Sequence, residues 1–311
     1  MQFLVVGPGA MGCLFAARLK QAGSDVMLMD HRPERAGVLE RQGVHVEGVS
    51  GEYTVRVPVT AGAEAGAVRP EFVLICVKSN QTQAAGRAVA DLVDRAAVVV
   101  TLQNGLGHVE TLRTLFGPDR VLGGVTSEGA TLLDTGRIRH AGRGETILGP
   151  QGEPGGPAER LAEAFNRAGF STRCLEDVTG VIWGKLIVNV GINALTALTR
   201  LRNGRLPEVQ GTRRVMARAV AEAAAVAEAK GVALPYPDPF GRVLEVCRGT
   251  AENVASMLQD VLKERLTEVD FINGAIVREG EALGVPTPAN EVLTNLVQAL
   301  QETYAERLAT P

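Results

Sequence analysis

The sequence of 311 residues predicts an α/β fold, in which a doubly wound parallel sheet (residues 1–176) is followed by an all-helical domain (residues 177–311). Three observations predict it. Short apolar runs alternate with helical patterns through the first half of the chain, and a glycine-rich turn joins the first run to the first helical pattern. Strand signals stop near residue 176, after which nearly every segment has helical periodicity.

The composition is that of an ordinary water-soluble protein. Hydrophobic residues make up 45% and charged residues 22%, and the net charge is −3, so we predict neither nucleic acid nor a membrane as a partner. The apolar runs are all shorter than about 18 residues, and the N-terminus enters a strand without a signal-like core, so we expect a cytoplasmic protein. With four scattered histidines and no C-x-x-C pair among four cysteines, we expect no metal site and no disulfide framework.

The chain begins with a strand, a glycine loop and a helix. Gln2 to Val6 is a short apolar run, G-P-G-A-M-G follows, and Cys13 to Ala22 has helical periodicity. In a G-x-G-x-x-G loop placed this way, Gly7 makes the turn, Gly9 lets backbone approach a pyrophosphate, and Gly12 lets the helix pack on the strand. The pyrophosphate then lies at the helix N-terminus. We therefore predict a dinucleotide-binding, Rossmann-type domain.

The second strand, Asp25 to Met29, ends in Asp30-His31-Arg32, which should contact the adenosine ribose of the dinucleotide. An acidic residue at this position normally hydrogen-bonds the 2′-hydroxyl of NAD, whereas a nearby arginine accommodates the 2′-phosphate of NADP. Because both residue types are present, the motif alone leaves both cofactors open. A solvated loop position ahead of Pro33 is the alternative for Arg32.

Two continuous apolar runs, Phe72 to Val77 and Val98 to Leu102, are typical of parallel strands buried on both faces. Lys78 follows the first run, and Asn104 with Gly105 follows the second. In an open parallel sheet the ligand lies beyond the carboxyl ends of the strands, so both positions are candidates for cofactor binding. A plain surface role for Lys78 and a simple turn at Asn104-Gly105 are the alternatives.

The rest of the first domain adds short strands and one helix. Residues 41–67 indicate short strands and turns, with the alternating residues 53–57 as an excursion on the sheet edge. Glu159 to Ala168 predicts a helix. Further strands are expected at Val121 to Val125, Gly136 to His140, Thr146 to Leu148 and Ser171 to Leu175.

An apolar helix from Trp183 to Thr199 carries the most specific signal in the second half. Its polar members Lys185, Asn189 and Asn193 are spaced i, i+4, i+8 and so form one narrow stripe. A buried ammonium and two buried amides each cost several kcal/mol unless they are hydrogen-bonded, and a bound polar ligand is the simplest partner. The alternative is a solvated face. Asparagine, a poor helix former, argues against that, as does the scarcity of lysine, with five residues against 27 arginines.

The segment Glu252 to Gly280 predicts another long helix or a broken pair, carrying Asn253, Ser256, Asp260 and Glu268. On a straight helix Asn253 and Ser256 lie about 60° apart, whereas Glu268 lies roughly 120° around from Ser256. Glu268 should therefore reach a different part of any ligand. Asp260 and Glu268 could instead be solvated surface residues.

Together these motifs resemble those of the ketopantoate reductase (2-dehydropantoate 2-reductase) family, over essentially the whole chain. They are G-x-G-A-x-G, the lysine after one strand, N-G-x-G after the next, K-x-x-x-N-x-x-x-N on the apolar helix, and N-x-x-S-M-x-x-D before T-E-x-D-x-I-N-G. The last two are far more specific than the glycine loop. One departure is Ala194, where the family commonly has proline.

The resemblance implies an oxidoreductase of pantothenate and coenzyme A biosynthesis, which reduces 2-dehydropantoate to pantoate with NADPH. It assigns cofactor contacts to Gly7, Pro8, Gly9, Ala10, Met11, Gly12, Lys78, Asn104, Ala130 and Glu268, to which the position after the second strand adds Arg32. It assigns substrate contacts to Lys185, Asn189, Asn193, Asn203 and Ser256, to which proximity to Ser256 adds Asn253, and Lys185 is also the catalytic residue.

The residue types suggest a mechanism. A 2-oxo acid needs a hydride at C2, which nicotinamide supplies, and a proton on the ketone oxygen, which it does not. The Lys185 ammonium can polarise the carbonyl and then protonate the alkoxide. Asn189 and Asn193 would hold substrate oxygens, Ser256 the carboxylate, and Glu268 the cofactor or Lys185. Because Lys185 and the glycine loop fall in different predicted domains, we expect the site in a cleft that closure orders.

NADPH is the expected cofactor, and NAD is the alternative. Arg32 can pair with the 2′-phosphate while Asp30 turns toward Arg35 or the glycine-loop amides. Two other functions stay open: a related 2-oxo acid reductase of the same family, and a non-catalytic NAD(P)-sensing protein, which would need no proton donor. A small 2-oxo acid is the expected partner, and the sequence leaves a homodimer open.

Overall fold

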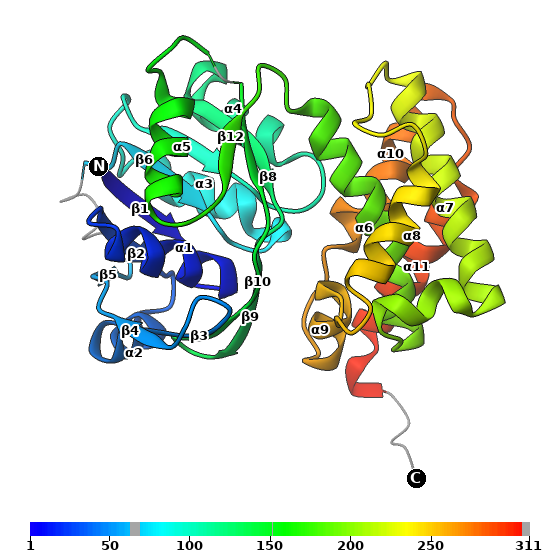
Figure 1. The fold of residues 1–311 in the computed structure, drawn as a ribbon, viewed down its shortest axis with the longest axis horizontal. Helices are drawn as coiled ribbons and strands as arrows, with labels where there is room; N and C mark the ends of the chain where they lie inside the picture. Colours follow the sequence, from blue (N-terminus) through cyan, green and yellow to red (C-terminus); the bar gives the residue numbers. More distant parts are fainter. Residues whose placement is uncertain (63–68, 151, 307–311) are drawn as a thin grey trace. The chain divides into compact units, whose positions relative to one another are not determined.

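The computed structural model describes residues 1–62, 69–150 and 152–306. The chain divides into two compact units (Figure 1). The first comprises Met1–Gln103 and His108–Val178, and the second comprises Asn104–Gly107 and the chain from Thr179 on. The short insertion Asn104–Gly107 therefore belongs, by its contacts, to the helical unit.

An eight-stranded sheet forms the centre of the first unit, in the order β12-β11-β8-β7-β6-β1-β2-β5. The strands are β1 (Gln2–Val6), β2 (Asp25–Met29), β5 (Val59–Thr60), β6 (Phe72–Ile75), β7 (Val98–Thr101), β8 (Val121–Thr126), β11 (Thr146–Gly149) and β12 (Thr172–Cys174). Neighbouring strands are parallel except β8 and β11, so the sheet is mixed where a parallel one was predicted. No helix lies between β8 and β11, and a parallel pair would need such a crossover.

The sheet is doubly wound because alternate residues of β1 enter different cores. Phe3 and Val5 pack in a core with α1 (Ala10–Gln21) and α5 (Pro157–Arg167), whereas Leu4 and Val6 pack in a core with α3 (Thr82–Ala90) and α4 (His108–Phe116). Between α1 and α5, the rings of Phe15 and Phe165 stack with centroids 5.3 Å apart. The predicted α/β class with a Rossmann-type first unit is confirmed.

A second, four-stranded sheet in the first unit was not predicted. Its order is β4 (Tyr53–Val55), β3 (Val44–Gly48), β10 (Arg137–Gly142) and β9 (Gly129–Asp134). The predicted edge excursion at 53–57 was therefore wrong, because β4 pairs with β3 away from the main sheet. No strand was predicted at 129–134, where intermediate burial leaves no alternation to detect. Residues 63–67 of the predicted strand-and-turn region lie outside the described residues.

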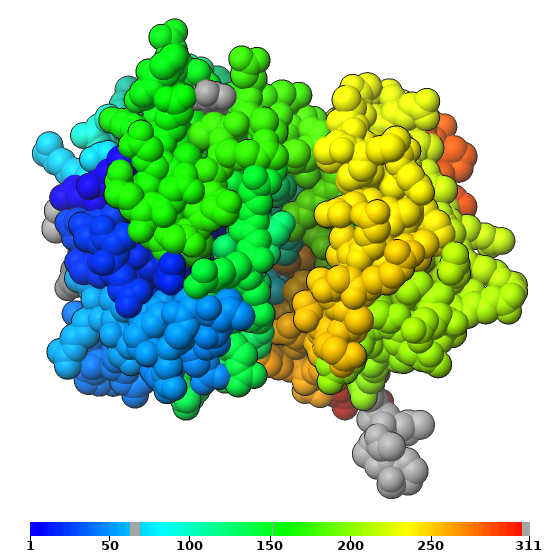
Figure 2. Space-filling model, viewed as in Figure 1, coloured from blue at the N-terminus to red at the C-terminus, as the bar shows by residue number. Residues whose placement is uncertain are grey.

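The regular structure of the second unit is all helical in its described residues, as predicted. Its α-helices are α6 (Thr179–Thr199), α7 (Gln210–Ala229), α8 (Pro239–Gly249), α9 (Ser256–Leu262), α10 (Asn273–Leu283) and α11 (Pro288–Glu302). α6 lies at the centre, in contact with α7, α8, α9 and α11. In the space-filling view, α8 (yellow to orange) covers much of the visible face of this unit (Figure 2).

Close packing explains the apolar character of α6. A Cβ at Gly191 would lie 2.8 Å from Val243, and one at Gly184 would lie 2.9 Å from Pro235, so both glycines let neighbours approach. By length and composition alone α6 could cross a membrane, contrary to the expectation that every apolar run is too short. Because 67% of its most apolar window is buried inside the protein, core packing accounts for this apolarity. The helix continues unbroken through Ala194.

The segment 252–280 is a broken pair of helices and not one long helix. α9 ends at Leu262, and Glu264 has a positive φ of 50°, which a helix cannot continue through. Asn253 precedes α9, and Glu268 lies just before a 3₁₀ turn at Val269–Phe271. The angles expected on a straight helix for these residues were therefore wrong.

Candidate active site

The glycine loop has the geometry of a diphosphate cradle. Gly7 has a φ of +97°, and a Cβ there would lie 2.7 Å from Val77, while a Cβ at Gly12 would lie 2.1 Å from the Gly7 carbonyl oxygen. A Cβ at Gly9 would meet only one atom, at 3.9 Å, so its absence leaves open space above the loop. α1 begins without a side-chain cap or an acidic residue in its first turn, which leaves its N–H groups for an anion. These residues fit a dinucleotide.

The carboxylate of Asp30, at the end of β2, is engaged by neighbouring residues of the same unit. It is buried and pairs with Arg35, whose Nη2 donates to Oδ1 at 2.8 Å and whose Nε donates to Oδ2. The backbone N–H of Arg32 also donates to Oδ1, at 3.1 Å. The expectation that Asp30 turns toward Arg35 is confirmed. The side chain of Arg32 is exposed, with its Nε 3.4 Å from His31 Nε2.

The predicted residues after β6 and β7 lie in different surroundings. Lys78 is exposed and precedes a 3₁₀ turn at Ser79–Gln81. Asn104 begins the short segment that belongs to the second unit, where the Leu106 N–H donates to the Phe271 carbonyl at 3.0 Å. A Cβ at Gly105 would lie 2.4 Å from that same carbonyl oxygen, so N-G-x-G here is a docked segment and not a simple turn.

Gln103 is a supporting residue that the sequence analysis missed. Its Nε2 donates to the Val77 carbonyl at 2.8 Å and to Thr82 Oγ1 at 2.9 Å, which ties the end of β7 to the end of β6. Its position directly after a buried strand was the available signal. Ala130, the remaining predicted cofactor contact of this unit, lies half-buried in β9, opposite His140.

The polar stripe of α6 is set into the core of the second unit. Lys185 and Asn189 are half-buried, and Asn193 is 4% exposed, so the stripe is not a solvated face. Burial lowers the pKa of Lys185 from 10.5 to about 8, and the negative charge of Glu268 opposes that change. The ammonium therefore gives up its proton far more readily than an ordinary surface lysine.

Glu268 and Asp260, which could have been surface residues, are both buried, at 8% and 6% exposed. Glu268 lies at the start of the 3₁₀ turn Val269–Phe271 and acts electrostatically on Lys185. Among residues 1–62, 69–150 and 152–306, no group of three or more His, Cys, Asp or Glu side chains could hold a metal ion.

Asn203 carries an unused acceptor. Its Nδ2 donates to Thr250 Oγ1 at 2.9 Å, and its backbone N–H donates to the Asn253 carbonyl at 3.2 Å. Its Oδ1 is buried without a hydrogen-bond partner in the described parts of the chain. Asn253 is exposed on the loop that precedes α9. Ser256 is exposed at the first position of α9. Thr250, which orients Asn203, was missed by the sequence analysis.

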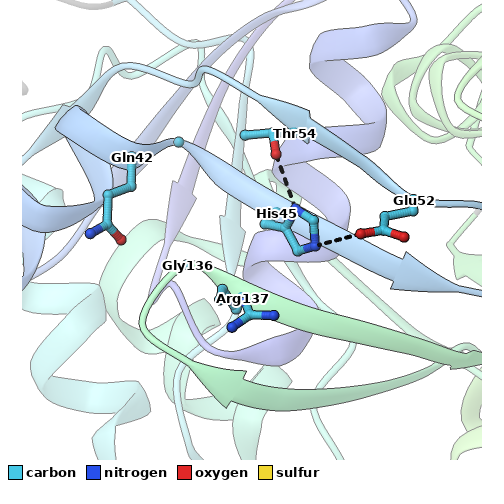
Figure 3. Close-up of a pocket in the computed structure, with 7 residues that line it drawn as sticks. Gln42, His45, Glu52, Thr54, Gly136 and Arg137 are labelled. Carbon is cyan, nitrogen blue, oxygen red and sulfur yellow. Dashed lines mark hydrogen bonds and ion pairs between the residues drawn. The ribbon is translucent and has the colours of Figure 1, made fainter.

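A pocket on the four-stranded sheet contains none of the predicted site residues. Figure 3 shows His45 at its centre, with Nδ1 3.0 Å from Thr54 Oγ1 and Nε2 3.6 Å from Glu52. Its lining is Gln42, Gly43, His45, Glu52, Thr54, Gly136 and Arg137. The Glu52 side chain is 77% exposed, so this is an open, solvated groove.

Two solved structures resemble this chain along nearly its whole length. A PanE/ApbA family ketopantoate reductase from Ralstonia eutropha has a TM-score of 0.89 and 36% identity, covering 97% of this chain and 99% of that one. A ternary structure of D-mandelate dehydrogenase with NADH and anilino(oxo)acetate has a TM-score of 0.90 and 26% identity, with the same coverage.

Sequence comparisons identify the family. The 2-dehydropantoate 2-reductase of Halobacterium salinarum is 36% identical over 97% of this chain and 99% of its own length. That of Vibrio cholerae is 30% identical over 98% of this chain and 100% of its own length. The family model described as "Ketopantoate reductase PanE/ApbA" matches residues 3–153, and its C-terminal counterpart matches residues 177–301. The chain therefore belongs to the ketopantoate reductase family.

Proposed function

We propose that this protein is an NADPH-dependent 2-dehydropantoate 2-reductase, which reduces ketopantoate to pantoate in pantothenate biosynthesis. The observation that carries the proposal is the stripe of Lys185, Asn189 and Asn193, set into an otherwise apolar core helix, with Glu268 acting on the lysine. The full-length relatives named 2-dehydropantoate 2-reductase support the same activity.

The reduction needs a hydride and a proton, and these come from different groups. When bound, the reduced nicotinamide supplies the hydride that forms the new C–H bond at C2. The Lys185 ammonium hydrogen-bonds the ketone oxygen, and its proton passes to that oxygen as the C=O π bond becomes a C–O single bond. Lys185 is left as a neutral amine and is reprotonated from solvent. A pKa of about 8 suits a general acid, since it is close to the working pH.

The other polar groups orient the substrate. Asn189 and Asn193 hold its oxygens, and the exposed Ser256 hydroxyl, with Asn253, receives the carboxylate. Asn203, whose Nδ2 and backbone N–H bond Thr250 and Asn253, is the remaining residue that we assign to the substrate. Glu268 keeps Lys185 charged in an environment that would otherwise neutralise it.

For the cofactor we propose NADP(H), bound on the first unit. The cradle of Gly7, Gly9 and Gly12 receives the diphosphate, and the exposed Arg32 meets the 2′-phosphate. Lys78, Asn104, Ala130 and Glu268 complete the assigned contacts. NADH is the alternative, because a similar solved structure, D-mandelate dehydrogenase, was determined with NADH. We place the enzyme in the cytoplasm, with a small 2-oxo acid as its partner.

The direct test is NADPH oxidation by the purified protein with ketopantoate. A panel should add the oxo acid of mandelate, because the resemblance to D-mandelate dehydrogenase makes another 2-oxo acid reductase the second candidate. A kcat/KM highest for ketopantoate supports the proposal. Faster turnover of the aromatic oxo acid favours the second candidate, and cofactor binding without turnover of any oxo acid favours a sensor.

The rate should depend on pH through Lys185. A general acid acts in its protonated form, so kcat/KM for the oxo acid, which reports the pKa of the enzyme before the oxo acid binds, should be constant at lower pH. It should fall as pH rises through about 8, with a tenfold loss per unit beyond it. An ordinary lysine would keep kcat/KM constant to about pH 10. The measurement is kcat/KM for the oxo acid between pH 6 and 10. A flat profile over this range would remove Lys185 from the proton-donating step.

Ser256→Ala should act mainly through KM. Loss of one hydrogen bond to a carboxylate costs roughly 1 to 3 kcal/mol, which raises KM for the oxo acid about 5- to 150-fold and changes kcat little. Because Ser256 is exposed, folding should be unaffected. Steady-state kinetics with Ser127→Ala, an exposed serine of the first unit, as control would test this. An unchanged KM would show that the hydroxyl points elsewhere.

A further inference from the structure

Three side chains near the C-terminus hold the segment that carries Glu268. Gln298 Nε2 donates to Asp270 Oδ1 at 2.6 Å, and Gln301 Oε1 accepts from both the N–H and the Oγ1 of Thr267, at 3.0 and 2.9 Å. The Tyr304 hydroxyl donates to the Arg265 carbonyl at 3.0 Å. Successive contacts are three residues apart on α11 and its following turn, while their partners run backward from 270 to 265.

The segment held in this way has little regular structure of its own. Residues 263–268 lie between the end of α9 and a 3₁₀ turn, and Glu264 has a positive φ. Without long helical or strand hydrogen bonding, the position of Glu268 depends on side chains that reach it from elsewhere. Thr267, the neighbour of Glu268, is 5% exposed, so the donor end of its two hydrogen bonds to Gln301 is buried.

The same segment anchors residues 104–107. The Phe271 carbonyl accepts from the Leu106 N–H at 3.0 Å, and Gly105 packs against that carbonyl closely enough to exclude a side chain. Arg278 Nη2 donates to the Asp270 carbonyl at 2.8 Å. One held segment thus connects Glu268 with the backbone that presents Asn104.

We propose that Gln298, Gln301 and Tyr304, here named the α11 clamp, are positioning residues that fix Glu268 beside Lys185 and dock the Asn104–Gly107 segment. The roles of Lys185 and Asn104 in this proposal rest on the proposed function. The hydrogen bonds of the clamp do not depend on it. None of the three clamp side chains is assigned to contact substrate or cofactor. They act through Thr267, Asp270 and the backbone.

The test is a pair of near-isosteric substitutions with a matched control. Gln298→Met/Gln301→Met removes both amides and keeps side-chain length. Thr303→Val is the control, because Thr303 Oγ1 donates only to the Ala299 carbonyl of its own helix at 2.8 Å. Gln301→Glu is the conservative variant, since it keeps the oxygen that accepts from Thr267. Circular dichroism and thermal unfolding show that each variant folds.

The first readout is the pKa of Lys185. Lysine labelled with ¹³C at Cε gives five resonances, one for each lysine, and Lys185→Met assigns the one of interest. Glu268 is the charged group that raises this pKa, while Tyr236, which donates to the Gly184 carbonyl beside Lys185, stays neutral because burial raises its pKa to about 12. We expect the double variant to lower the pKa of Lys185 by about half a unit or more, toward the value in Glu268→Gln.

The second readout is hydrogen exchange by mass spectrometry. We expect exchange of residues 104–107 to speed up about tenfold in the double variant and to stay at the wild-type rate in Gln301→Glu and Thr303→Val. A merely structural brace would lower the melting temperature but leave the pKa of Lys185 and the exchange of residues 104–107 unchanged, and that result would overturn the proposal. Neither readout needs substrate. Failure to reduce ketopantoate would therefore count against the proposed function alone.

Discussion

Lys185→Ala is expected to lower kcat by about 10² to 10⁴-fold while NADPH binding stays intact, because the variant loses the only assigned proton donor to the ketone oxygen. The structure sharpens the expectation. Lys185 belongs to a helix whose other faces are packed, and burial lowers its pKa to about 8. A water molecule that filled the space left by the alanine substitution would be a much weaker proton donor. Saturation kinetics of NADPH oxidation and NADPH binding by fluorescence would measure the two effects separately.

Two further variants make this test specific. Lys185→Met keeps the volume of the side chain and should be as inactive as Lys185→Ala, which excludes a cavity as the cause. Lys230→Ala removes a lysine of the same unit that pairs with Glu279 at 2.6 Å, with 42% of its side chain exposed, and should retain wild-type kcat. A kcat for Lys185→Ala within tenfold of wild type would remove this residue from the mechanism.

The elements whose residues repeat a simple pattern could be predicted from the sequence. β6 and β7 are continuous apolar runs because both faces of the main sheet are covered, and α6 is apolar on every side but one because helices surround it. The stripe on α6 was visible because i, i+4 spacing is a property of any helix. For these elements the local pattern and the tertiary environment agree.

The elements that depend on distant partners could not be predicted. β9 has no clear alternation, and it pairs with β10, whose other neighbour, β3, comes from nearly a hundred residues earlier in the chain. The break after α9 contains one residue with positive φ, and the segment after it donates hydrogen bonds to Gln301 of α11; neither feature leaves a periodic signal. Gln103 and Thr250 were missed for the same reason, because their supporting hydrogen bonds, to Val77 and Thr82 and from Asn203, join residues far apart in the chain.

The residues around the ribose position show how one tertiary contact changes the meaning of a motif. Read locally, Asp30 at the end of β2 predicts NAD. In the folded chain both of its oxygens are occupied by Arg35 and by the backbone of Arg32, and its side chain is buried. A carboxylate engaged in this way neither accepts readily from the ribose diol nor strongly repels a 2′-phosphate, so we expect Arg32 to decide the preference between NADP(H) and NAD(H).

The wild-type enzyme is therefore expected to prefer NADPH, and Arg32→Ala is expected to lower kcat/KM for NADPH about 10- to 100-fold while changing that for NADH little. A charge-assisted pair between guanidinium and phosphate contributes about 1.5 to 3 kcal/mol, which corresponds to that range. Arg32 is exposed, so its loss should not affect folding. The measurement is kcat/KM for both cofactors in both proteins, with Arg41→Ala, an arginine at the far end of the following helix, as control.

Arg35→Ala is the complementary variant, because it releases the Asp30 carboxylate that Arg35 now holds. The released carboxylate should repel the 2′-phosphate and accept from the ribose hydroxyl, so the preference should move toward NADH even though Arg32 is still present. Thermal unfolding must accompany the kinetics, since Asp30 is 1% exposed and loses its cation. If wild type prefers NADH, or if the NADPH-to-NADH ratio is the same with and without Arg32, the phosphate does not bind at this arginine and the NADP(H) proposal is wrong.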